Sequence, residues 1–215
     1  MEQNNKNLCA ICGLNEATTM DHLPPKSIFP RPRPNNLITV PSCANCNNTA
    51  SVLDETFRLY LAYHVRNLND EVAESYFQEA RRTYEHNERL RREMEDNSEP
   101  KGIITESGNY AGEGGKILWN SEAHDATIKR TVRGLYFHHF GEILGIDVHV
   151  APKWFNKPDQ EFLNPSSDYK KNIIGDNQVI YFYGRVEEQP SESIWYFEFY
   201  GKHWAGAHTG LETIT

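Results

Sequence analysis

"TTMDHLPPKSIFPRPRPNNLITVPSCANCNN" spans residues 18–48 and carries an Asp-His pair, a proline-rich run and a C-x2-C pair. Pro24 and Pro25 stop ladder pairing and hold the chain extended, so we expect a strand that ends just before them. The Asp-His pair would then lie at a strand end. A second strand is expected over residues 35–43, followed by a helix whose N-terminus lies near Asn47. The predicted order is strand, long loop, strand, helix.

The four cysteines of the chain form two C-x2-C pairs, Cys9/Cys12 and Cys43/Cys46, on either side of the Asp-His pair. In a reducing cytoplasm this pattern indicates metal ligands rather than disulfides. A C-x2-C turn presents two sulfurs to one ion, and zinc prefers four soft ligands in a tetrahedron. Because four thiolates leave no open position for water, we expect a structural zinc that stabilises a segment with little core of its own. The alternative is four unrelated buried cysteines.

The motifs follow one another in a characteristic order over about residues 8–60: C-x2-C, Asp-His-x-x-Pro, Asn-Leu and C-x2-C-Asn. This order resembles the zinc-bearing HNH endonucleases, which have the ββα-metal fold. The matching pieces are Cys9/Cys12, DHLPP from Asp21, NNL from Asn35 and CANCN from Cys43. A lone Asp-His pair would be a weak signal, whereas Asp-His-x-x-Pro between two C-x2-C pairs is a specific one.

The resemblance implies a role for each matched polar residue. His22 would be the general base that draws a proton from the attacking water, since imidazole titrates near neutrality. Asp21 would bind a single Mg²⁺ or Mn²⁺, which prefer oxygen ligands, and Asn47 would complete that site from the helix start. The ion would polarise the scissile phosphate and stabilise the leaving oxygen. Asn36 would brace the loop by hydrogen bonding and orient His22.

Two departures from the family pattern affect the expected ion site. Many relatives carry a histidine where this helix has asparagine, which predicts weaker ion binding, and the spacing leaves the ligand open among Asn45, Asn47 and Asn48. Neighbours in a regular strand point to opposite faces, so Asp21 and His22 share a site only where the strand ends or twists. The alternatives are a surface pair without chemistry and asparagines that serve only as turn and cap residues.

The charge of the chain limits how it could contact nucleic acid. Its formal net charge is -8, which disfavours binding through the overall electrostatic field. Contact would therefore require metal ions or a local basic patch. Lys26, Arg31 and Arg33 lie on the proline-rich loop beside the expected ion site and could hold phosphates there. The alternative is a solvated polyproline segment without a ligand.

The remaining residues predict a helical middle segment and a C-terminal region of antiparallel strands. Residues 51 to about 95 predict two helices. Residues 51–68 have apolar residues at three-to-four spacing, and residues 71–96 predict a second, strongly charged helix with Glu/Arg pairs near i,i+4. Residues 96–115 predict a linker or a loose hairpin. A helix that ends near Gly141 precedes aromatic, partly alternating strands. We expect an α+β chain with a zinc module over 1–60, a helical segment and linker over 61–115, and an α+β domain over 116–215.

These observations predict a metal-dependent HNH-type nuclease that hydrolyses DNA phosphodiesters, and the family implies a role in phage defence or a mobile element. The alternative is a non-catalytic zinc-binding module that recognises nucleic acid or a protein partner, which should not depend on His22. No run of eighteen apolar residues and no apolar signal core occur, so we expect no membrane span and a cytoplasmic protein. A homodimer would suit double-strand cutting.

Overall fold

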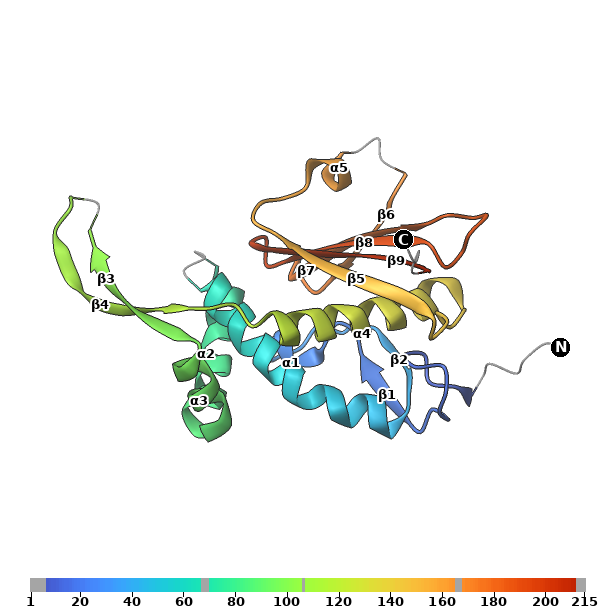
Figure 1. Ribbon diagram of the computed structural model, residues 1–215, viewed down its shortest axis with the longest axis horizontal. Coiled ribbons are helices and arrows are strands. Elements are labelled where there is room, and N and C mark those ends of the chain that lie inside the picture. The colour runs from blue at the N-terminus through green and yellow to red at the C-terminus, as the bar shows by residue number, and fades with distance from the viewer. Residues whose placement is uncertain (1–6, 67–69, 106, 165–167, 212–215) are drawn as a thin grey trace.

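The computed structural model describes residues 7–66, 70–105, 107–164 and 168–211 (Figure 1). Within these ranges the chain is mixed α and β with antiparallel sheets, which confirms the predicted class at this level. No helix in the described ranges is long and apolar enough to cross a membrane. Residues 1–6 of the predicted zinc module and 212–215 of the predicted C-terminal domain lie outside the described residues, and the division into three units stays a prediction.

The N-terminal part forms two antiparallel strands followed directly by a long helix: β1 (Thr19–His22), β2 (Thr39–Ser42) and α1 (Ala44–Val65). A single 3-10 turn, η2 (Lys26–Ile28), interrupts the loop between the strands. Asp21 lies opposite Val40 in the sheet, and His22 lies opposite Thr39. The observed order of elements is therefore the strand, loop, strand and helix predicted from residues 18–48.

The middle of the chain consists of two helices and a projecting hairpin: α2 (Glu71–His86), α3 (Glu88–Asp96), β3 (Ser98–Ile104) and β4 (Tyr110–Ile117). The charge pattern predicts one helix where the structure has two. The break lies at Asn87, whose side chain accepts the Leu90 N–H and caps α3, a role that asparagine favours. Figure 1 shows the hairpin reaching away from the other elements, so the hairpin alternative is the correct one.

The C-terminal part consists of a long helix, a five-stranded sheet and a short helix: α4 (Ser121–Phe140), β5 (Val148–Phe155), α5 (Gln160–Leu163), β6 (Lys170–Ile174), β7 (Val179–Arg185), β8 (Ser193–Phe199) and β9 (His203–Leu211). The sheet order is β5-β9-β8-β7-β6, and every pair is antiparallel, as predicted. Helix α4 ends at Gly141, which adopts the left-handed conformation with φ 69°. Its predicted end is confirmed.

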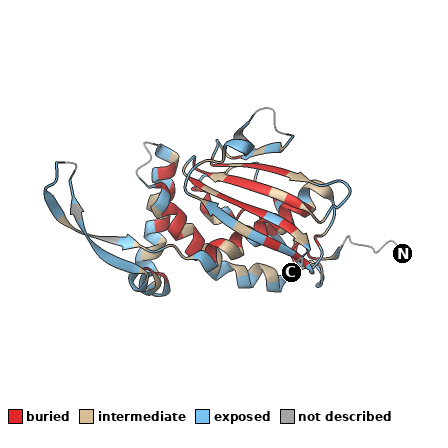
Figure 2. Ribbon diagram, turned by 45° about the horizontal axis from the view of Figure 1, so that its top comes forward, coloured by how far each residue is buried: buried red, intermediate tan, exposed pale blue. Residues whose placement is uncertain are grey.

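One hydrophobic core joins strand β2, helices α1, α2, α3 and α4, and Leu23 just after β1 to the inner face of the C-terminal sheet. Helix α4 lies between that sheet and the N-terminal elements. Figure 2 shows buried residues along the helices and along the strands of the sheet. Gly134 lies where α4 closely approaches the N-terminal elements, because a Cβ there would lie 1.8 Å from Leu23 Cδ1 and 3.2 Å from Val40 Cγ2. The absence of a side chain at Gly134 therefore brings α4 against the strand end that carries the Asp-His pair.

Buried histidines lie where α1, α4 and β9 meet. The ring centroid of His203 is 5.4 Å from that of His124 and 4.9 Å from that of Trp119. Both histidines are almost fully buried, and the Nε2 atom of each lacks a hydrogen-bond partner within the described residues. Burial lowers the pKa of both, and for His203 the neighbouring imidazoles add to the effect. Each ring is therefore neutral when the chain is folded at pH 7.

This cluster predicts a loss of stability in mild acid. A histidine whose pKa is lowered on folding binds more protons when unfolded, so its stability is complete above the unfolded pKa of about 6.5 and falls below it. For each histidine we expect the free energy of unfolding to drop by up to about 1.4 kcal/mol per pH unit below that value. Denaturant titrations of zinc-loaded protein between about pH 7.5 and about pH 5.5 measure the slope. The His203→Phe variant should have a shallower slope, and an unchanged slope would contradict this assignment.

Candidate functional site

The four cysteines meet at one point although residues 13–42 separate the two pairs. Their Sγ atoms all lie within 4.8 Å of one another, and no other group of three or more His, Cys, Asp or Glu residues in the described ranges is arranged to hold a metal ion. The Cys43 sulfur caps α1 by accepting the Cys46 N–H. Burial opposes ionisation of Cys9, but surrounding N–H groups lower its pKa to about 7. Four soft thiolates in this arrangement can hold a metal ion such as zinc.

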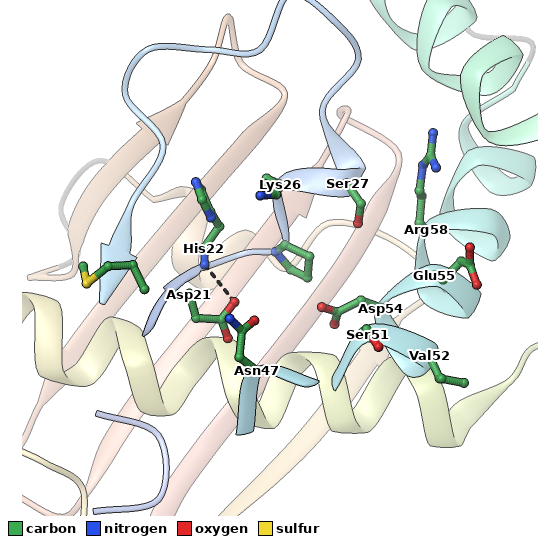
Figure 3. Close-up of a pocket in the computed structure, with 12 residues that line it drawn as sticks. Asp21, His22, Lys26, Ser27, Asn47, Ser51, Val52, Asp54, Glu55 and Arg58 are labelled. Atoms are coloured by element: carbon green, nitrogen blue, oxygen red, sulfur yellow. Dashed lines mark hydrogen bonds between the residues drawn. The ribbon is translucent and has the colours of Figure 1, made fainter. Parts of the chain in front are cut away.

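The Asp-His pair lies in the wall of an open pocket of about 450 Å³ between β1, the η2 turn and the first half of α1 (Figure 3). The Asp21 carboxylate turns toward Asn47, and the His22 ring points away from Asn47, on the same side of the strand as Lys26. The His22 N–H donates to Asp21 Oδ1 at 2.8 Å, which fixes the carboxylate against its own strand end. Both residues line the pocket because β1 ends at His22, as the proline positions predict.

Asn47 reaches the same pocket from the first turns of α1. Its Nδ2 donates to Thr19 Oγ1 at 3.2 Å, so the amide oxygen retains its acceptor capacity. Asn45 and Asn48 are exposed and are not among the residues that line the pocket. Of the three asparagines left open by the sequence, Asn47 is therefore the one beside Asp21. A carboxylate and an amide oxygen are the hard donors that Mg²⁺ and Mn²⁺ prefer, so this donor set fits the predicted ion by its chemistry.

Arg130 of α4 contacts two acids that line the pocket, Asp21 and Asp54, and no pattern in the sequence indicates these contacts. Its Nη1 donates to Asp21 Oδ2 at 2.8 Å, and its Nη2 donates to Asp54 Oδ2. Burial raises the pKa of Asp21 against the effect of the arginine cation. Burial likewise raises the pKa of Asp54 to about 6, with Arg130 opposing it. Since Arg130 lies 109 positions from Asp21, only the folded chain brings the two together.

Asn36 has partners different from those predicted. Its Nδ2 donates to the Ile173 carbonyl, and its Oδ1 accepts the Gly175 N–H, each at 3.0 Å. These bonds tie the proline-rich loop to β6 and the turn that follows it. Asn36 does brace the loop, but the predicted hydrogen bonding that orients His22 is wrong, because the amide nitrogen and oxygen of Asn36 bond to β6 and to the turn that follows it.

The three cations of the proline-rich loop lie in different surroundings. Lys26 lines the Asp-His pocket, and Arg33 Nε donates to the Lys26 carbonyl at 3.1 Å. Burial lowers the pKa of His22, and the charges of Lys26 and Arg33 lower it further, which favours the neutral imidazole. Arg31 instead lines a separate cleft next to α2. Of the three cations, Lys26 therefore lines the Asp-His pocket, Arg33 lies beside Lys26, and Arg31 lines another cleft.

Comparisons with family models, curated proteins and solved structures find no match to this chain. The likeness to HNH endonucleases therefore rests on the order of the motif residues in the sequence.

Proposed function

We propose that this chain is a metal-dependent nuclease of the HNH type that hydrolyses phosphodiester bonds, with DNA as the expected substrate. The observation that carries the proposal is the convergence of Asp21, His22 and Asn47 on one pocket. They come from a strand end and a helix start that meet beside the four-cysteine cluster. The HNH resemblance implies this combination of residues. The phage-defence or mobile-element role and a homodimer stay predictions of that resemblance.

Each residue of the pocket would have a distinct task in hydrolysis. His22 would accept the proton of the attacking water at an imidazole nitrogen, since a neutral imidazole is an effective base near pH 7. Asp21 and Asn47 would hold the divalent ion through their oxygens. When bound, that ion supplies charge stabilisation to the scissile phosphate and the leaving oxygen. The early turns of α1 add a field that favours phosphate.

The net negative charge of the chain is compatible with this proposal because individual cations line the pocket. Lys26 lines the pocket, and Arg58 of α1 lines it from the opposite side. Arg58 also lies 3.8 Å from Glu79, so its charge is partly balanced. Lys26 is therefore the cation we expect to contact a phosphate next to the scissile one.

Substitution of Lys26 tests this contact. A charge-assisted hydrogen bond to phosphate contributes about 1.5 kcal/mol, so Lys26→Ala should raise KM for a DNA substrate roughly tenfold with little change in kcat. Arg31→Ala is the matched control: it removes one cation from the same loop and should leave KM unchanged, because Arg31 lines another cleft. Equal effects of the two substitutions would show that only the overall charge matters.

A non-catalytic zinc-binding module is the second candidate, and one observation favours it. The Asp21 carboxylate already pairs with Arg130, so its charge is partly balanced without an added ion. Labelled single-stranded DNA, duplex DNA and RNA, each incubated with zinc-loaded protein and Mn²⁺, separate the candidates. Shortened products that require Mn²⁺ support the nuclease. Retarded but intact nucleic acid supports the binding module.

A further inference from the structure

We propose that Arg130 of α4 is a positioning residue that holds Asp21 of the Asp-His pocket and occupies the place between Asp21 and Asp54 where a further divalent ion would otherwise bind. The inference rests on the proposed function in taking Asp21 as an ion ligand. It goes beyond that function because it assigns a residue of α4 to the site. The charge of this residue limits how strongly the site binds divalent ions.

The geometry of Arg130 is that of a bridge between two carboxylates. One terminal nitrogen donates to Asp21 Oδ2 and the other to Asp54 Oδ2, so the planar guanidinium contacts both acids at once. The three side chains are 8%, 9% and 16% exposed for Arg130, Asp21 and Asp54. Thr127, one turn before Arg130 on α4, donates to Asp54 Oδ1 at 3.3 Å. Asp21 of β1 and Asp54 of α1 therefore both contact one cation, Arg130 of α4.

The charges explain why this place requires a cation. Two carboxylates that are mostly removed from water repel each other, and they stay ionised only if a positive group lies between them. Arginine suits the task better than lysine because its rigid fork reaches two acids at once and keeps its charge when buried. With Arg130 in place the three groups sum to one negative charge, and Asp21 Oδ1 retains acceptor capacity for one ion.

The position of α4 makes this bridge possible. Gly134 lies one turn beyond Arg130, and its lack of a side chain lets α4 approach Leu23 and Val40. The same helix packs on β5 and β9 of the C-terminal sheet. The proposed ion ligand Asp21 is thus held by a residue whose helix is anchored to the C-terminal part.

The test measures Mn²⁺ binding to the zinc-loaded full chain without nucleic acid, by the electron paramagnetic resonance signal of free Mn²⁺. Arg130→Gln releases two carboxylates and removes a repelling charge, so Mn²⁺ should bind at least about tenfold more tightly than to the wild type. The same variant should unfold at a lower temperature, and Mn²⁺ should restore much of that loss. A merely structural ion pair would lower the unfolding temperature without recovery by Mn²⁺. The double variant Arg130→Gln/Asp54→Asn should lose the gain in affinity.

Equal or weaker Mn²⁺ binding by Arg130→Gln, or a gain that persists in the double variant, overturns the inference. If Arg130→Gln does not fold, Asp54→Asn replaces it, since this variant keeps the contact between Arg130 and Asp21. Its loss of one negative charge should weaken Mn²⁺ binding about tenfold, and unchanged binding overturns the inference. Failure of the proposed function is a separate result: a wild type that cuts no nucleic acid but shows these Mn²⁺ effects refutes only the nuclease.

Discussion

His22→Ala should reduce metal-dependent cleavage by about 10²- to 10⁴-fold, because a positioned general base contributes that much to a hydrolytic step. The loss should fall on kcat, with KM for the nucleic acid little changed, since His22 acts on the attacking water. The ring is half-buried at the edge of the pocket and does not belong to the hydrophobic core, so the variant should fold. Single-turnover cleavage of a labelled duplex gives the chemical rate directly.

The control for His22→Ala is His86→Ala, which removes an exposed imidazole at the end of α2. It should cleave at the wild-type rate, and both variants should keep the zinc content and unfolding midpoint of the wild type. Cleavage by His22→Ala at the wild-type rate would show that another group is the base, and the roles assigned to the Asp-His pocket would then be wrong.

Cys43→Ser should have the largest effect on stability. Cys43 contributes a sulfur to the four-cysteine cluster, lies almost fully buried and caps α1. Binding of a structural zinc contributes folding free energy directly, so losing one thiolate should cost on the order of 5 kcal/mol. We expect less than one zinc per chain by elemental analysis and an unfolding midpoint at much lower denaturant concentration.

Asn45→Ser is the matched control for Cys43→Ser, because it places the same residue type at an exposed position two residues away. It should leave both zinc content and stability unchanged. Zinc removal from the wild type should reproduce the effect of Cys43→Ser. A zinc-free wild type that unfolds at the same denaturant concentration as the zinc-loaded protein would show that the cluster has no structural role.

Local features of the sequence predict the N-terminal elements well. Pro24 and Pro25 mark the end of β1, and the helix predicted to start near Asn47 begins three residues earlier at Ala44, because both signals act within a few residues. The spacing of the two pairs predicts that the sulfurs meet, and they do. The break between α2 and α3 is missed, because Asn87 caps α3 within a stretch whose charge pattern continues on both sides.

Long-range contacts are what the sequence cannot predict. An asparagine can bond to many groups, so nothing near Asn36 indicates that its partners lie at Ile173 and Gly175. Arg130 resembles any cation on a helix until α4 packs against β1. Asn47 is distinguished from its neighbours only once the start of α1 fixes which side chains face the pocket.

Nicking of supercoiled plasmid by the zinc-loaded wild type, with and without added Mn²⁺, is the most direct test of the central claim. The claim is that Asp21, His22 and Asn47 form the site of a metal-dependent nuclease. Open-circular product that accumulates with Mn²⁺ and is absent without it is the predicted result. Plasmid that stays supercoiled with Mn²⁺ present, while the four cysteines hold zinc and the chain is folded, would contradict the account.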